Sequence, residues 1–139
     1  MMIGKVFNKD GCTVKENATL QEAAKLMADE NIGFLVVISD NEATPTGTVT
    51  DRDIVVKAIA KYLDVTDTKV SEIMCKDLLT LDETQGIGEI IELMSEKKIR
   101  RIPIVNNNKV SGVVSMDDLL SLLAKEINTL AEIPREQNA

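Results

Sequence analysis

Apolar residues along the chain follow the same succession of helical and extended patterns twice. Within residues 20–27, and again within 87–94, they recur at positions i, i+3, i+4 and i+7, the stripe of one helix face. A short continuous apolar run follows each stripe, at 34–38 and at 101–105, and indicates a strand covered on at least one face. The first stripe falls on the second after a shift of 67 residues (20 to 87), which predicts a tandem repeat.

Each apolar run leads into a polar turn and a returning strand. The turns cover residues 39–46 and 106–109, and their asparagines, which tolerate positive φ, favour hairpins. The returning strands end at Thr50 and Ser115, and a further apolar helical stripe follows each of them, over 54–62 and 119–127. Each half is therefore predicted to run β-α-β-β-α, with an extended or helical lead-in at Ile3 and at Val70.

The repeat also predicts the domain organisation. Residues 1–66 form the first repeat, residues 67–133 the second, and residues 134–139 a loose C-terminal tail, with the polar segment 64–68 as the linker. Halves of about 60 residues that each expose an apolar sheet face gain by packing against one another. We expect an α/β (α+β) fold in which the two repeats pack sheet to sheet about a pseudo-two-fold axis. That symmetry would bring equivalent strand ends to one shared cleft.

The most informative polar residues lie where the returning strand meets the second helix. Thr50-x-x-Asp53 and Ser115-x-x-Asp118 place a hydroxyl and a carboxylate at equivalent junctions. Such a pair can satisfy the helix's own N–H groups as a capping box. The same helix N-terminus can also hold a phosphate, and the carboxylate can accept from both hydroxyls of a ribose. Capping and nucleotide binding are both open here, and the two roles can coexist.

Composition and charge narrow the classes of function. With 23 acids against 16 bases the net charge is −7, which argues against nucleic-acid binding. The chain has no histidine, so imidazole chemistry is excluded, and Cys12 and Cys75 form no metal-binding or CxxC pattern. It also lacks a nucleophile elbow and a Walker loop, so an enzyme is not expected. No apolar run approaches about 18 residues, and the N-terminus does not look like a signal peptide, which favours the cytoplasm.

With the repeat and its junctions in place, the chain resembles a cystathionine-β-synthase (CBS) domain pair, also called a Bateman module. The resemblance covers about Ile3 to Leu130. It rests on residues 69–74 (KVSEIM), the helix at 19–27, residues 99–105 (IRRIPIV), and the two Gly-x-x-Thr/Ser-x-x-Asp endings. The family implies adenosine-type sites in the cleft between the repeats, for AMP, ADP, ATP, S-adenosylmethionine or a dinucleotide. It further implies a homodimer formed through the helices, and a regulated partner protein that the sequence leaves unnamed.

The resemblance also implies roles for individual residues. In related pairs, a basic residue at the position of Arg100 or Arg101 faces the phosphate of a nucleotide whose ribose is held by the other repeat. Site 1 is then expected to comprise Thr50, Arg52, Asp53, Arg100 and Arg101. Site 2 is expected to comprise Ser115, Asp117, Asp118, Gly33 and Phe34. The expected base slot consists of Cys12, Thr13, Val14, Leu79, Thr80 and Leu81, whose backbone groups would read the adenine edge; ordinary sheet core remains an open role for their side chains.

The two expected sites differ in charge. Gly33-Phe34 stands where the second repeat has Arg100-Arg101, and arginine's planar fork suits phosphate. Likewise, the arginine before Asp53 is replaced by an acid before Asp118. We predict one strong phosphate-bearing site and a weaker one suited to a nucleoside-like or cationic ligand.

These patterns leave three hypotheses of function. The leading one is a non-catalytic sensor of an adenine nucleotide or adenosyl ligand, without a cofactor or a resident metal. A structural dimerisation or interaction module with empty clefts is the first alternative. The second is an unrecognised enzyme, in which Asp51, Asp53, Asp117 and Asp118 collect a Mg²⁺ ion beside a nucleotide. Membrane and nucleic-acid partners are not expected.

Overall fold

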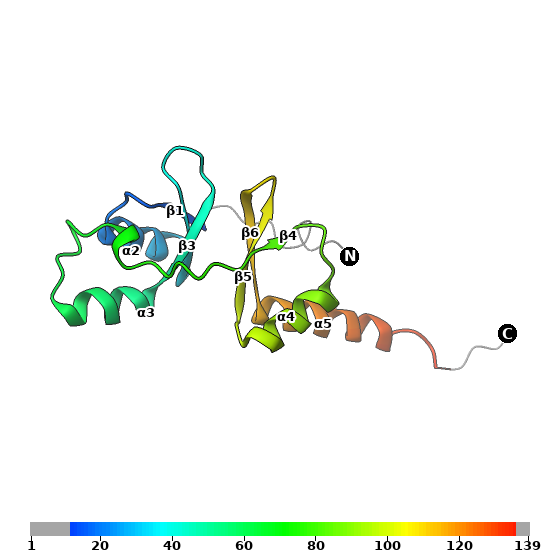
Figure 1. The fold of residues 1–139 in the computed structure, drawn as a ribbon. Helices are drawn as coiled ribbons and strands as arrows, with labels where there is room; N and C mark the ends of the chain where they lie inside the picture. Colours follow the sequence, from blue (N-terminus) through cyan, green and yellow to red (C-terminus); the bar gives the residue numbers. More distant parts are fainter. Residues whose placement is uncertain (1–11, 136–139) are drawn as a thin grey trace.

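The computed structural model describes residues 12–135, which form two similar halves side by side (Figure 1). The first half consists of β1 (Thr13–Lys15), α2 (Leu20–Glu30), β2 (Phe34–Ile38), β3 (Pro45–Thr50) and α3 (Asp51–Asp53). The second consists of β4 (Leu81–Asp82), α4 (Ile87–Lys97), β5 (Arg101–Asn106), β6 (Lys109–Ser115) and α5 (Met116–Ala131). The same β-α-β-β-α order in both halves confirms the predicted repeat and the mixed α/β fold.

Each half carries a three-stranded sheet with the same strand order. β2 pairs in parallel with β1 and antiparallel with β3, and β5 pairs in the same way with β4 and β6. The register sets Phe34 opposite Thr50 in the first sheet and Arg101 opposite Ser115 in the second. The start of each central strand therefore lies beside the end of each returning strand. As a result, residues expected in different sites are direct neighbours. Phe34 of site 2 lies beside Thr50 of site 1, and Arg101 of site 1 lies beside Ser115 of site 2.

The first helix of each half forms as the apolar stripe predicts. At α2, the Glu22 N–H donates to the Thr19 hydroxyl at 3.2 Å, whereas Gly86 begins α4 without a side-chain cap. Both helices end at a residue in the left-handed conformation, Asn31 and Lys98. The inward faces of these helices are fully or nearly buried, so each helix covers its own sheet. Buried residues are Leu20, Ala23 and Met27 in α2, and Ile90 and Met94 in α4.

The core has a part in each half and a part between them. Aliphatic side chains of helix and sheet form one cluster in the first half and a second in the other. A third cluster contains Cys12, Val36 of β2 and Val113 of β6, and therefore joins the two halves. The linking segment adds to the edge of β3, where Thr48 and Cys75 exchange two backbone hydrogen bonds of 2.9 and 2.8 Å. These contacts hold the two sheets against one another, as predicted.

The second helix differs between the halves and departs from its predicted apolar side. In the first half α3 gives way to a π turn at Ile54–Ala58 and a 3₁₀ turn at Ile59–Lys61, whereas α5 is continuous. In residues 51–61 and in α5, only a narrow row of apolar side chains packs against the sheet of the same half. Within 12–135 no second layer of the chain covers the other apolar residues, so part of the predicted stripe is exposed. Exposed members are Val55, Tyr62, Leu120, Leu123 and Ile127, while Ile54, Ala58 and Leu119 are buried.

The turns and the lead-in show how local chemistry sets the connections. Asn107 and Asn108 both adopt positive φ in the tight turn between β5 and β6, as expected of asparagine. In the longer first turn, Ala43 takes that conformation instead. The predicted lead-in at Val70 is a 3₁₀ turn over Val70–Glu72, and the one at Ile3 lies outside the described residues. The domain boundaries at 66 and 133 stay predictions.

Candidate ligand pockets between the repeats

Two cavities lie where the halves meet, and residues of both halves line each of them. The larger has a volume of about 590 Å³ and the smaller about 220 Å³. The larger combines Thr50, at the end of β3, with Arg100 and Arg101, which follow α4. The smaller combines Ser115, at the end of β6, with Gly33, which follows α2. Each cavity thus pairs the helix N-terminus of one half with the strand start of the other.

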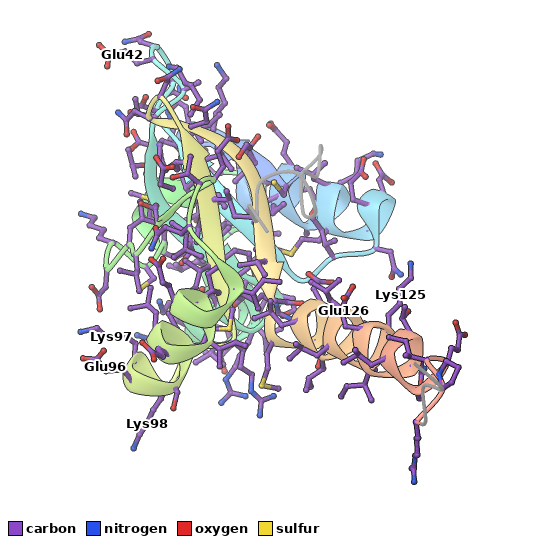
Figure 2. All side chains as sticks on the ribbon, turned by 90° about the vertical axis from the view of Figure 1, so that its right-hand side faces the viewer. Glu42, Glu96, Lys97, Lys98, Lys125 and Glu126 are labelled. Carbon is purple, nitrogen blue, oxygen red and sulfur yellow. The ribbon has the colours of Figure 1, made fainter. Side chains whose placement is uncertain are left out.

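Positive charge gathers on one side of the larger cavity. Lys97, Arg100 and Arg101 line it from the second half, facing Thr48 and Thr50 of β3. Lys97 lies at the end of α4, next to Lys98 (Figure 2). Lysine and arginine on one wall, opposite the threonine hydroxyls of β3, are complementary to a phosphate.

The rest of the larger cavity can hold the remainder of a ligand. Leu78, Leu79, Ile99 and Pro103 form apolar parts of its lining, which suit a planar base. One carboxylate, that of Asp77, also lines it. Together with the cationic wall, these groups fit a ligand that has an apolar ring at one end and a negative charge at the other.

The hydroxyl–carboxylate pairs form capping boxes in both halves. The Asp53 N–H donates to the Thr50 hydroxyl at 3.0 Å, and the Thr50 N–H donates to an Asp53 carboxylate oxygen at 3.0 Å. The corresponding distances for Ser115 and Asp118 are 3.0 and 3.1 Å. The capping role is therefore present in both copies. A carboxylate has about four lone-pair sites, so acceptor capacity remains for a ribose.

Asp53 and Asp118 differ in their surroundings. The ammonium of Lys57, one helical turn on, lies 3.4 Å from the second oxygen of Asp53 and also donates to the Ile73 carbonyl. The residue one turn after Asp118 is Leu122. Asp118 lines the smaller cavity, whereas Asp53 is half-buried beside its own helix and is not among the residues that line the larger one.

The remaining residues of the two expected sites divide into two groups. Gly33, Phe34, Ser115 and Asp118 come together in the smaller cavity, as site 2 requires. Arg52 and Asp117 are exposed and are not among the residues lining either cavity. In a helix, the residue two after the N-cap points away from the cap's side of the turn, which explains this position.

The expected base slot is divided between the cavities and the cores. Leu79 lines the larger cavity and Cys12 the smaller. The side chains of Val14 and Leu81 are buried in the cores of their own halves, where α2 and α4 cover them. Thr13 and Thr80 are half-buried beside them. Reading of a base by backbone groups in these segments stays a prediction.

Several lining residues were not expected from the sequence. Thr48 lies two residues before Thr50 on β3, so strand alternation already places both side chains on the same face. Lys97 replaces the acidic Glu30 of the first repeat, a charge difference that was visible in the aligned repeats. Asp77 and Cys75 carried no comparable signal, because they enter the larger cavity through the path of the linking segment.

Arg101 and Phe34 form a contact that sequence reasoning also missed. They occupy equivalent positions, at the start of β5 and of β2, and the Arg101 guanidinium carbon lies 5.7 Å from the centre of the Phe34 ring. Both residues line both cavities. Alignment of the two repeats assigned these residues to separate sites. Such an alignment shows which positions are equivalent, but it does not show where the repeats touch.

Residues 12–135 contain no group of three or more Cys, Asp and Glu side chains arranged to hold a metal ion. No helix within that range has both the length and the apolar character needed to cross a membrane.

Comparison with known proteins agrees with this geometry. The CBS domain family model matches residues 3–59 and 70–125. The chain is 37% identical over 107 residues to the CBS domain-containing protein YhcV of Bacillus subtilis, covering 77% of this chain and 74% of that one. It spans between 66% and 79% of the length of the first curated relatives that it matches.

Solved structures show the same fold. Hypoxic Response Protein I, whose crystal structure holds two coordinated zinc ions, matches with a TM-score of 0.77 and 29% identity, over 87% of this chain and 98% of that one. A CBS domain pair in complex with 5′-methylthioadenosine and S-adenosyl-L-methionine matches with a TM-score of 0.76 and 26% identity. That match covers 91% of this chain and 98% of the other.

Proposed function

This chain belongs to the CBS domain family, as a pair of CBS repeats, and we propose that it is a non-catalytic sensor that binds an adenine nucleotide or adenosyl ligand between the repeats. CBS domain pairs are in general ligand-binding regulatory modules. The larger cavity takes the phosphate-bearing ligand, AMP, ADP or ATP. In this proposal the protein is cytoplasmic, and ligand binding regulates a partner protein. The ligand does so by its differential affinity for two conformations of the repeat pair.

One observation carries this proposal: the larger cavity combines a cationic wall, an apolar wall and the hydroxyls of Thr48 and Thr50. Arg100, Arg101 and Lys97 offer charge-assisted donors to a phosphate, and the hydroxyls of Thr48 and Thr50 line the cavity opposite them. Leu79 and Ile99 offer apolar surface to the base. These three cations outnumber the one carboxylate among the described lining residues, that of Asp77, so the cavity favours an anion.

The ribose is the least constrained part of the ligand. The Asp53 oxygen most open to the ribose hydroxyls is the one that Lys57 contacts at 3.4 Å, since the other oxygen already accepts from the Thr50 N–H. A small rotation of the Lys57 side chain, which is 42% exposed, frees that oxygen while the Thr50 cap stays in place. Asp77, which lines the cavity directly, is a second candidate to accept from the ribose hydroxyls.

The exposed apolar residues support a homodimer as the assembled state. Val55 and Ile59 in the first half, and Leu120, Ile127 and Leu130 on α5, are more than half exposed. Apolar surface of this kind on a helical face favours association with a matching surface. A second copy of the chain supplies that match, since both halves carry an equivalent face.

Calorimetric titration of AMP against the full chain tests the proposal. Binding at 100 times Kd should raise the free energy of unfolding by roughly 2.7 kcal/mol, seen as a thermal shift. Replacing Arg100 with Gln should weaken AMP binding by about tenfold or more, the value of a hydrogen bond to a charged group, and should leave adenosine binding nearly unchanged. Lys98→Gln is the matched control, since it removes an exposed charge two residues away.

The same titration separates the alternatives. A structural dimer with empty clefts predicts no thermal shift with AMP, ADP, ATP or S-adenosylmethionine. An enzyme predicts turnover of ATP or AMP in the presence of Mg²⁺. Either result would overturn the proposal.

A further inference from the structure

Arg101 and Phe34 together separate the two cavities. Each begins the central strand of its own sheet, and each borders both the larger and the smaller cavity. Their separation of 5.7 Å is within the range of a cation–π interaction. A single guanidinium, resting on a single aromatic ring, is therefore in reach of ligands on both sides.

The other charges of the two cavities are unequal. The larger cavity also has Arg100 and Lys97, whereas among the described residues of the smaller one Arg101 is the cation and Asp118 the anion. A phosphate in the larger cavity therefore has three cations nearby. Among the described lining residues of the smaller cavity, a phosphate would depend on Arg101 for a cationic donor.

We propose, resting on the proposed function, that Arg101 is a specificity-determining residue shared by the two pockets. Only one pocket at a time then holds a phosphate-bearing ligand tightly, and the smaller pocket takes an uncharged adenosine-type ligand. The reason is geometric: the planar fork of arginine binds one phosphate bidentately and cannot present the same donors to a second. An anion in the larger cavity draws the guanidinium to itself and away from the smaller one.

The proposal predicts negative coupling between two phosphates and little coupling when the second ligand is neutral. Coupling between sites in proteins is typically about 5- to 150-fold in affinity. A neutral ligand does not need the guanidinium, so its affinity for the smaller pocket stays the same whether or not the larger one is filled.

The experiment is to block the larger pocket and measure AMP binding at the smaller one. Cys75 lines the larger cavity and is partly exposed, whereas Cys12 is buried at the smaller one. Alkylation of the full chain with N-ethylmaleimide, with mass spectrometry confirming one adduct at Cys75, places a bulky group in the larger cavity and obstructs it. We expect AMP to bind the alkylated protein at least about five-fold more tightly than it binds in its second, weaker step to the unmodified protein.

Three variants and one ligand serve as controls. Arg101→Gln should abolish this gain, while Arg100→Gln, which alters only the larger cavity, should preserve it. The weaker adenosine step should be the same before and after alkylation. Thr48→Trp fills the same cavity without the reagent and should reproduce the gain.

The outcomes separate the two claims. If none of AMP, ADP, ATP and S-adenosylmethionine binds the unmodified protein, the proposed function fails, and the shared role of Arg101 fails with it. If AMP binds but its affinity for the smaller pocket is unchanged by blocking, or if the gain persists in Arg101→Gln, only the sharing is overturned.

Discussion

Gly47 is the position where the structure makes its sharpest prediction about stability. A Cβ added there would lie 2.6 Å from the Cys75 carbonyl oxygen and 2.9 Å from the Met74 sulfur. The methionine side chain can move, but the carbonyl belongs to the backbone that bridges to Thr48. Alanine at this position must therefore push the linking segment away from β3.

The cost of Gly47→Ala follows from two effects. Overpacking of a close contact costs about 1–3 kcal/mol. Weakening one of the two Thr48–Cys75 hydrogen bonds adds about 0.5–1.5 kcal/mol. We expect the free energy of unfolding to fall by about 2–4 kcal/mol in total, given that these effects overlap. Because Thr48 and Cys75 also line the larger cavity, AMP binding should weaken as well.

The assay is urea unfolding followed by circular dichroism, with the m-value checked for two-state behaviour. The matched control is Gly88→Ala in α4, where an added Cβ meets no atom within 4 Å. That control should stabilise the protein by about 0.5–1 kcal/mol, since alanine is the better helix former. A Gly47→Ala protein as stable as the wild type would refute the reasoning, and so would equal effects at the two positions.

Two further predictions concern assembly and pH. Leu120→Glu combined with Ile127→Glu should convert a dimer to a monomer in light scattering, while Lys125→Glu on the same helix should not (Figure 2); a wild-type monomer would contradict this. Hydrogen bonds from the Thr84 hydroxyl and N–H lower the pKa of Asp82, so this pair stabilises the fold above the ordinary pKa of aspartate and the effect is lost as pH falls through the lowered pKa. Thr84→Val should raise the pKa of Asp82 in an NMR titration; an unchanged pKa would show that the hydroxyl has no part.

The linking segment shows why some lining residues could not be predicted. Thr48 follows from strand alternation with Thr50, and Lys97 from a charge difference between aligned repeats. Asp77 and Cys75 reach the larger cavity only because the segment after Val70–Glu72 runs along the edge of β3. That path depends on an isolated pair of hydrogen bonds between distant residues, and no local pattern encodes it.

The second helix of each half shows a limit of a different kind. Its apolar stripe predicts burial, and Ile54, Ala58 and Leu119 are buried. The same stripe leaves Tyr62 and Ile127 exposed, since periodicity says which residues share a face and not what lies opposite that face.

What the sequence by itself determined is the repeat: the β-α-β-β-α order, the polar ends of β3 and β6, and the unequal charges at residues 33–34 and 100–101. These depend on short-range periodicity and on comparison between the halves, which a single chain already contains. Only the tertiary structure decided that Arg101 and Phe34 stand between two unequal cavities. The physical reason is that a cavity is shaped by how two sheets are placed relative to each other, and that placement is the sum of many contacts between residues far apart in the chain.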